Sequence, residues 1–295
     1  MNWLQIIHET AYTYCKPVRF GPHRLVLRPR EGHDVRVEEM ALEIEPAASV
    51  GWSRDVFGNS VAHVILFEPS AILRIRNRVL LHFAHPFPAR VAAPSISYPV
   101  QYSPLEWSVA SAYQTTTFPN DVPDVQSWVR GIAASAEGAD AESVVALVNR
   151  KVHESIRYNR REAKGVQTPA ETLRDGTGSC RDMATLLLEA LRQLGFPARV
   201  ASGYLDCQAS EAGRASTHAW AEVYFPEVGW LGFDPTSGLA TSAKHVVIGV
   251  SNHPRGVMPI SGSFFGEPEE YVGMAVTVST ERFEQRPEAP LDVAR

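Results

Sequence analysis

Cys180 is the residue whose setting most clearly indicates chemistry. It follows a glycine-rich turn at 176–179 and opens a strongly apolar run, CRDMATLLLEALRQL, of helical length. A cysteine in the first turn of a helix lies beside unpaired backbone N–H groups and the positive end of the helix dipole, which favour the thiolate. Most free cysteines are small buried residues, but a core cysteine does not require the flanking glycines Gly176 and Gly178. The setting therefore predicts a nucleophile.

The neighbours of Cys180 predict where the helix begins. Ser179 can cap the helix, and Asp182 is an acidic variant of the usual capping-box partner. Cys180 is then the first helical residue, with Arg181 adding positive charge nearby. Its backbone amide is the first expected donor to an oxyanion formed when the thiolate attacks a carbonyl.

Two further residues complete the pattern of a thiol enzyme. His218 opens an alternating stretch, HAWAEVYF, and Asp234 ends another stretch, GWLGFD, directly before Pro235. Each has an ordinary reading by itself, because the chain holds 10 histidines and aspartate before proline is common in turns. A thiolate needs a base within ~3 Å, and that base needs a partner to fix its tautomer. Together the three residues predict acyl transfer.

Three aromatic residues are weaker candidates for the same site. Tyr158, in SIRYN, is a candidate second oxyanion donor or a lining residue of a substrate groove. Trp220 and Trp230 flank the expected site and are candidates to shield it from water. Core packing is the alternative reading for all three.

The length and charge of the chain limit the classes of protein to which it can belong. The chain has 295 residues, 44% hydrophobic and 21% charged, which is enough for two domains with cores. The formal net charge of -5 argues against a nucleic-acid partner, for which a basic domain would be expected.

Cysteine usage and the N-terminus predict the compartment. Cys15, Cys180 and Cys207 are widely spaced and form no CxxC pair, which argues against disulfides or a thiolate zinc cluster. The N-terminal residues do not resemble a signal peptide, and no stretch approaches the roughly 18 apolar residues of a membrane span. These features predict a cytoplasmic protein without a membrane partner.

The hydrophobic pattern divides the chain into two parts. Residues 1–112 are predicted to form an N-terminal β domain, an antiparallel sandwich without helices. Residues 113–295 are predicted to form an α+β domain in which helices precede strands. The last strand, about 271–280, can join either domain, and the tail at 284–295 is predicted to be mobile.

Long stretches of the chain resemble a known family. GSCRDMATLLLEALRQLGFPARVASGYL and HAWAEVYFPEVGWLGFDPTSG resemble the transglutaminase-like superfamily of papain-type thiol enzymes. HETAYTYCKPVRFGPHRLVLRPR and WSRDVFGNSV resemble the β domain that precedes this core in a bacterial subfamily. The resemblance implies a papain-like core in which the helix of the nucleophile packs on an antiparallel sheet. It also implies Cys180 as nucleophile, His218 as base and Asp234 as the residue that orients it.

The resemblance implies an enzyme and leaves its reaction open. If water resolves the thioester, the protein is a protease or amidase; if an amine does, it is a transglutaminase. We favour hydrolysis of a peptide or protein substrate, because no cytoplasmic cross-linking substrate is apparent. No cofactor or metal is expected, and no acidic loop resembles the calcium sites of animal transglutaminases. Residues 250–266 depart from the pattern of the subfamily, so its substrate preference is not carried over.

Two alternatives of other classes remain. The chain could be a non-catalytic peptide-binding module, although none of the three expected catalytic residues is missing. Cys180, His218 and Asp234 could instead bind zinc as three ligands with an open fourth position. The sequence makes no prediction of oligomeric state.

Overall fold

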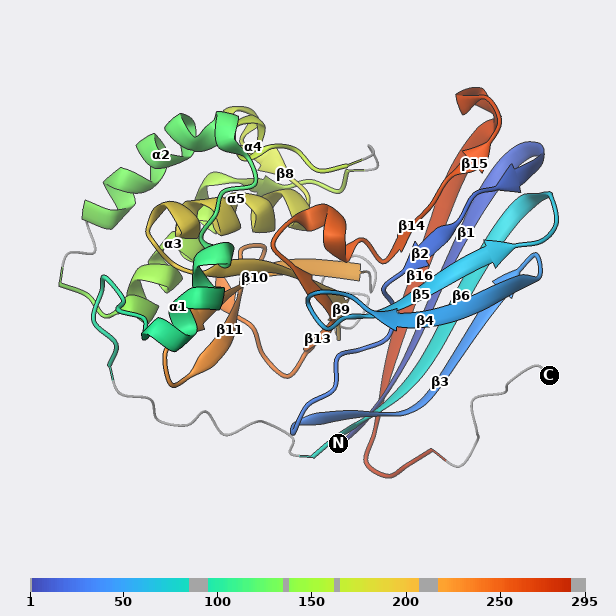
Figure 1. Ribbon diagram of the computed structural model, residues 1–295, viewed down its shortest axis with the longest axis horizontal. Helices are drawn as coiled ribbons and strands as arrows, with labels where there is room; N and C mark the ends of the chain where they lie inside the picture. The colour runs from blue at the N-terminus through green and yellow to red at the C-terminus, as the bar shows by residue number, and fades with distance from the viewer. Residues whose placement is uncertain (1, 85–94, 135–137, 162–164, 207–216, 288–295) are drawn as a thin grey trace.

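Strands from the first third of the chain form a β-sandwich. The computed structural model describes residues 2–84, 95–134, 138–161, 165–206 and 217–287 (Figure 1). The N-terminal strands are β1 (Trp3–Phe20), β2 (His23–Leu25), β3 (Val35–Glu45), β4 (Ala48–Arg54), β5 (Ser60–Leu66) and β6 (Ser70–Phe83). One sheet has the order β15-β1-β6-β3, and the other has the order β14-β2-β5-β4, with β14 (Ile260–Ser261) and β15 (Phe264–Phe265) supplied by the C-terminal region. Pairing within both is antiparallel, as predicted.

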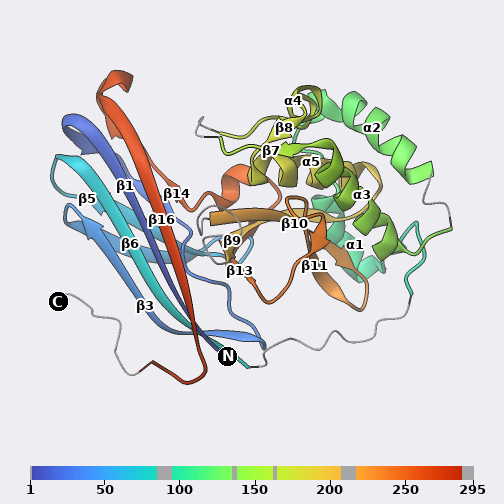
Figure 2. The same cartoon turned by 180° about the vertical axis from the view of Figure 1, so that it is seen from behind.

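The last strand belongs to this sandwich. β16 (Tyr271–Phe283) pairs with β1 from Tyr14↔Tyr271 to Trp3↔Phe283, and the two strands lie side by side in Figures 1 and 2. The structure thus answers the question that the sequence left open about residues 271–280. Of the tail predicted to be mobile, residues 288–295 lie outside the described residues.

The second part of the chain places helices before strands, so the predicted α+β class is confirmed. The helices are α2 (Val122–Ala134), α3 (Ala141–Ser155), α4 (Pro169–Asp175) and α5 (Cys180–Gln193). The strands β9 (Ala198–Leu205), β10 (Thr217–Phe225), β11 (Gly229–Asp234), β12 (Leu239–Ala240) and β13 (His245–Ser251) form an antiparallel sheet of order β12-β11-β10-β9-β13. The polar residues 206–216, between β9 and β10, lie outside the described residues from 207 onward.

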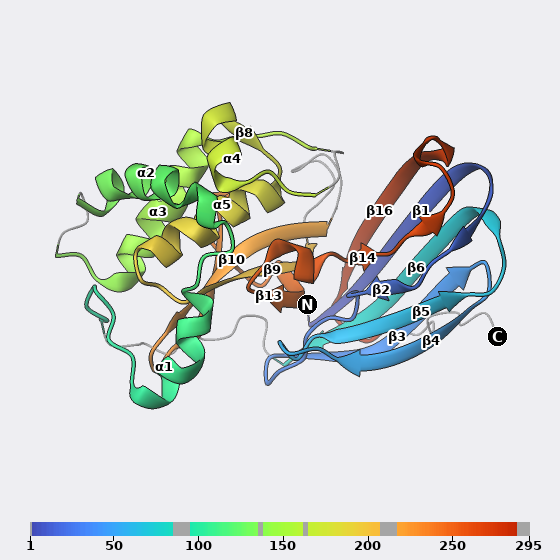
Figure 3. The ribbon, with the colours of Figure 1, turned by 45° about the horizontal axis from the view of Figure 1, so that its top comes forward.

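Apolar side chains cover both faces of this sheet. On β10 the alternate residues Ala221, Val223 and Phe225 pack with α5, as the small face of this strand predicted. On the opposite face, Tyr204 and Ile248 belong to one buried cluster with Leu4, Ile6, Val79 and Leu81 of the sandwich. The helices, the sheet and the sandwich therefore follow one another across the molecule (Figure 3).

Among the elements that the sequence analysis did not predict, α1 (Pro104–Ala110) and β4 are the longest. α1 lies within the region predicted to lack helices. Its start carries a complete capping box, with Ser103 as N-cap, Pro104 at N1 and Glu106 bonded back to the Ser103 amide at 2.9 Å. β4 was missed because its side chains are largely exposed and give no clear alternation. None of the helices in the described ranges is long and apolar enough to span a bilayer.

A buried ion pair on α5 holds residues 111–123, the linker that leads into α2. Arg192 contacts Glu189 at 2.8 Å, and both side chains are buried on α5. Arg192 also donates to the carbonyl oxygen of Tyr113, while Glu189 accepts the Thr117 hydroxyl at 2.8 Å. The linker, which includes the short 3-10 helices η1 (Ser111–Tyr113) and η2 (Pro119–Asp121), is therefore held against α5.

Asn59 joins the sandwich to the edge of the second sheet. Its side chain is fully buried, accepts the Val250 backbone N–H at 2.9 Å and donates to the Val250 carbonyl at 2.7 Å. It also donates to Asp55 at 2.9 Å and accepts from Arg30 at 2.8 Å. The amide thus acts as a one-residue strand partner for β13.

We expect Asn59→Ala to lower the free energy of unfolding by about 3 kcal/mol, because it leaves two buried backbone groups of Val250 without partners. Chemical denaturation of wild type and variant measures the difference. Asn120→Ala, at an exposed asparagine, is the matched control and should change little. A loss below about 0.5 kcal/mol for Asn59→Ala would contradict this role.

Candidate active site

Cys180 occupies the first position of α5, as the sequence predicted. Ser179 is the N-cap residue, and the Asp182 carboxylate accepts its backbone N–H at 2.9 Å and its hydroxyl at 2.8 Å. The Cys180 thiol is free and partly exposed. A substrate can therefore reach a sulfur that is mounted on an otherwise buried helix.

Asp182 also organises the chain around the start of α5. It has no exposed surface, accepts from Arg161 Nε at 3.1 Å and accepts the Gln167 backbone N–H at 2.8 Å. Gly178 is needed beside it, because a Cβ at that position would lie 3.0 Å from the Asp182 Cβ. The glycine that precedes the cysteine thus permits close packing of the turn against the helix.

His218 and Asp234 form a buried hydrogen-bonded pair. His218 Nε2 lies 2.9 Å from Asp234 Oδ2, and only 8% and 2% of these residues is exposed. Cys180 also acts on His218, because its side chain contributes to the raised pKa of the imidazole. Cys180, His218 and Asp234 form the candidate row of sulfur, imidazole and carboxylate, in which the contact between His218 and Asp234 is established by distance.

The row shifts the pKa of both titrating partners toward the charged form. Burial lowers the pKa of His218, but the hydrogen bonds from Asp234 and Cys180 and their negative charges outweigh it and raise the pKa to about 10. Burial raises the pKa of Asp234, and the hydrogen bonds of His218 and His245 outweigh it, so the pKa lies well below its usual range. At neutral pH the site accordingly holds an imidazolium beside a carboxylate.

Tyr158 lies close to Cys180. It belongs to β7 (Arg157–Tyr158), which pairs in parallel with β8 (Thr177–Gly178), directly before the cysteine. Burial and the charge of Cys180 raise the pKa of the Tyr158 phenol. The side chain is 48% exposed, so it borders solvent next to the thiol.

The two tryptophans lie differently from one another. Trp220 is 1% exposed and its ring is 6.2 Å from that of His218, so it packs behind the imidazole within the core. Trp230 lies under the Arg199 guanidinium at 3.9 Å and against Tyr113 at 4.9 Å. Among the described ring contacts of Trp230, none is with Cys180, His218 or Asp234.

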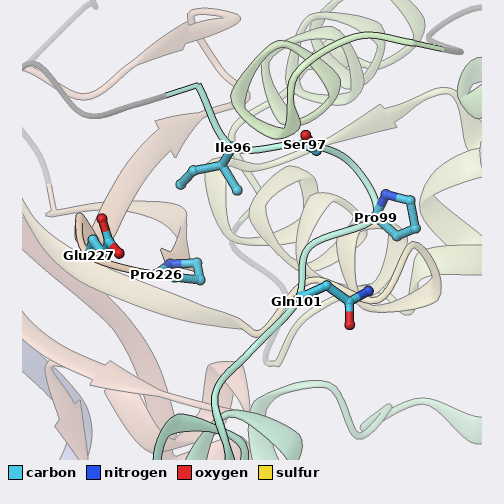
Figure 4. Close-up of a pocket in the computed structure, with 6 residues that line it drawn as sticks. All are labelled: Ile96, Ser97, Pro99, Gln101, Pro226 and Glu227. Atoms are coloured by element: carbon cyan, nitrogen blue, oxygen red, sulfur yellow. The ribbon is translucent and has the colours of Figure 1, made fainter.

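A surface pocket of about 250 Å³ lies away from this row (Figure 4). It is lined by residues of two segments, Ile96, Ser97, Pro99, Gln101, Pro226 and Glu227. Pro226 follows the last residue of β10, whereas His218 lies near its first residue, so roughly 25 Å of strand separates them. The pocket is not the site of the expected chemistry.

His245 is the neighbour that sequence reasoning missed. Its Nε2 lies 3.4 Å from the same Asp234 oxygen that His218 contacts. Ligand atoms of His218, Asp234 and His245 all lie within 4.8 Å of one another, so these residues, rather than Cys180, form the group that could hold a metal ion. Its only sequence signal was a histidine at the start of a predicted strand.

A thiol at a helix N-terminus, together with a histidine that contacts an aspartate, is the arrangement expected of a papain-type site. The sequence profile of the Transglutaminase-like superfamily matches residues 126–235, and that of the Bacterial transglutaminase-like N-terminal region matches residues 4–81. The chain belongs to the transglutaminase-like superfamily, whose members are generally cysteine-protease-like enzymes, and carries the bacterial N-terminal region.

Relatives share the arrangement along the chain. An uncharacterized protein of Mycobacterium tuberculosis is 26% identical over 292 residues, covering 95% of this chain and 93% of its own. A protein-glutamine gamma-glutamyltransferase of Pseudomonas aeruginosa is 36% identical over 105 residues, which is 33% of this chain and 16% of that protein. A crystal structure from Cytophaga hutchinsonii, provisionally described as a cysteine protease, shares the fold with a TM-score of 0.74 and 14% identity, covering 97% of this chain and 93% of that one.

The raised pKa of His218 predicts a pH-dependent stability. The pair of protonated His218 and ionised Asp234 contributes fully to the free energy of unfolding below the ordinary histidine pKa of 6.5. This contribution is lost as the pH rises toward the pKa of about 10 in the folded state. The difference in unfolding free energy between wild type and His218→Asn should therefore shrink across this window. Denaturant unfolding at several pH values measures it.

Cys180→Ala serves as the control for this titration. It removes a side chain that helps to raise the pKa of His218, so the loss of stability should still begin near pH 6.5 but be complete at a lower pH than in the wild type. A wild-type His218 that titrates near 6.5 by NMR would refute the ion pair.

Proposed function

We propose that the protein is a thiol-dependent acyl-transfer enzyme that hydrolyses a carboxamide or peptide bond through a thioester on Cys180. The proposal is supported by Cys180 at the first position of α5, by the hydrogen bond between His218 and Asp234, and by the contribution of Cys180 to the raised pKa of His218. Neighbouring imidazolium and helix N–H groups both stabilise a thiolate. The residue types and their order also fit the superfamily to which the chain belongs.

The steps follow from the positions of the side chains. The Cys180 thiolate attacks the carbonyl carbon, and the resulting oxyanion is stabilised by the free N–H groups of the first helical turn. The Tyr158 hydroxyl, beside the sulfur, is the proposed second donor. His218 then protonates the leaving amine, and Asp234 stabilises the orientation and charge of the imidazolium until proton transfer occurs.

Neutral His218 completes the cycle. It accepts a proton from water, which attacks the thioester and releases the acid product and the free thiolate. Trp220, closed off from solvent, is proposed to support the imidazole by packing. We assign no direct role to Trp230, because its ring contacts lie with Arg199, Tyr113 and Tyr224.

Amine transfer is the second candidate. It is favoured by the likeness of one third of this chain to a protein-glutamine gamma-glutamyltransferase. The two reactions share every step up to the thioester and differ only in whether water or an amine resolves it. For either, we propose a peptide or protein substrate and a cytoplasmic location. A non-catalytic binding module would require neither the free thiol nor the imidazolium.

We expect Cys180 to react with iodoacetamide at about pH 6 faster than an ordinary thiol, because the thiolate is the reactive form. Peptide mass spectrometry resolves the cysteines, and Cys15, exposed and free, is the internal control. His218→Ala should bring the rate for Cys180 close to that for Cys15. Equal rates for the two cysteines in the wild type would contradict the proposal that Cys180 is an activated nucleophile.

Intact-mass trapping with a panel of glutamine and peptide substrates tests the function itself. An acyl adduct on Cys180 identifies the acyl group, and its decay with and without added amine separates hydrolysis from transfer. Asp234→Asn should lower turnover about 10⁴-fold, and Tyr158→Phe by about 10²-fold or more if its hydroxyl binds the oxyanion. Adducts that form equally well on Cys180→Ala would exclude the proposed nucleophile, and an unchanged Tyr158→Phe would remove that donor.

A further inference from the structure

His245 is a second imidazole beside Asp234, outside the row of groups expected to react. Its side chain is 9% exposed, and its Nε2 lies 3.4 Å from Asp234 Oδ2. The same oxygen accepts from His218 at 2.9 Å, so two imidazoles share one acceptor atom. The other carboxylate oxygen, Oδ1, accepts the Thr236 backbone N–H at 2.9 Å.

The backbone fixes the tautomer of His245. Ser242 donates its backbone N–H to His245 Nδ1 at 3.1 Å, and His245 donates its own backbone N–H to the Ser242 carbonyl at 2.9 Å. An amide N–H can only donate, so Nδ1 must carry a lone pair. The ring proton therefore resides on Nε2, which donates it to Asp234.

The ring is also held in place by packing. Trp220 meets His245 edge to face, with 5.2 Å between ring centroids. Trp220 can extend over β9 because residue 203 is glycine, where a Cβ would lie 2.8 Å from the indole. Arg282 of β16 donates to the Ala243 carbonyl at 3.0 Å and supports the turn that carries His245. Position and proton are thus both determined by the fold.

We propose that His245 is a positioning residue for the acyl-transfer reaction, which donates through Nε2–H to Asp234 and so holds the carboxylate in the plane that aims His218 at Cys180. This inference rests on the proposed function. Without His245, Asp234 keeps the His218 contact but loses the second donor that fixes Oδ2. The reacting imidazole would then sample orientations in which it is no longer directed at Cys180.

A metal ion is the competing occupant of this position. Two histidines and a carboxylate are ordinary zinc ligands. A metal on His245 Nε2 would move the ring proton to Nδ1, where it would face the Ser242 N–H, donor against donor. The backbone contact therefore favours a proton on Nε2.

The test uses two substitutions, one that removes the donor and one that keeps a donor. His245→Phe keeps a ring against Trp220 and removes the donor, whereas His245→Gln keeps an N–H donor. We expect His245→Phe to lower kcat about tenfold with KM unchanged, the loss typical of one charge-assisted hydrogen bond, and His245→Gln to retain most of the rate. His33→Phe, at an exposed histidine, is the control and should leave kcat unchanged.

A second measurement is independent of turnover. NMR of the imidazole nitrogens in folded Cys180→Ala should show His245 protonated on Nε2 alone, whether or not the proposed reaction is correct. Failure of the proposed function appears instead as activity that survives Cys180→Ala or Asp234→Asn. Wild-type kcat in His245→Phe, a proton on Nδ1, or stoichiometric zinc binding that His245→Phe abolishes would each overturn the proposal for His245.

Discussion

The buried carboxylate of Asp234 is the constraint around which the second domain is arranged. An ionised group with 2% exposure is stable only where donors replace water, and Asp234 has three, from His218, His245 and Thr236. They come from β10, from β13 and from the turn after β11, so the sheet must curve and order its strands to bring them together. The same donors keep Asp234 ionised and His218 protonated, which is the state that a thiolate partner requires.

The β-sandwich packs directly against the sheet that carries Asp234. It covers the face of the sheet that the helices leave free, through the apolar cluster around Tyr204 and Ile248. Asn59 pairs with the edge of β13, and Arg282 holds the turn before it. Since β13 begins at His245, contacts made by residues from both ends of the chain reach the environment of Asp234. The region that matches the bacterial N-terminal family thus contacts the strand that carries His245.

Local sequence patterns predicted the individual residues of the site. The features that the sequence did not predict depend on contacts between residues far apart in the chain. Glycines, a cap and an apolar run located Cys180 at a helix start, and alternation placed His218 and Asp234 at strand ends. His245 and Asn59 escaped notice because one histidine or asparagine carries no signal until its partner is known, and Val250 is 191 residues from Asn59. β16 could not be assigned to a sheet for the same reason, since its partner β1 lies at the opposite end of the chain. The capping signal of α1, in contrast, was present and was overlooked.

The start of α5 presents an apparent conflict, because Asp182 places a negative charge within one turn of a sulfur that must itself be negative. The structure resolves it by neutralising that carboxylate. Asp182 accepts from Arg161, from the Gln167 backbone and from Ser179, and it is closed off from solvent. These donors offset the negative charge of Asp182. The positive end of the helix dipole therefore remains available to a thiolate at Cys180. The same contacts hold residue 161 and residues 165–167 against the start of the helix, so the residue that caps α5 also fixes the chain around Cys180.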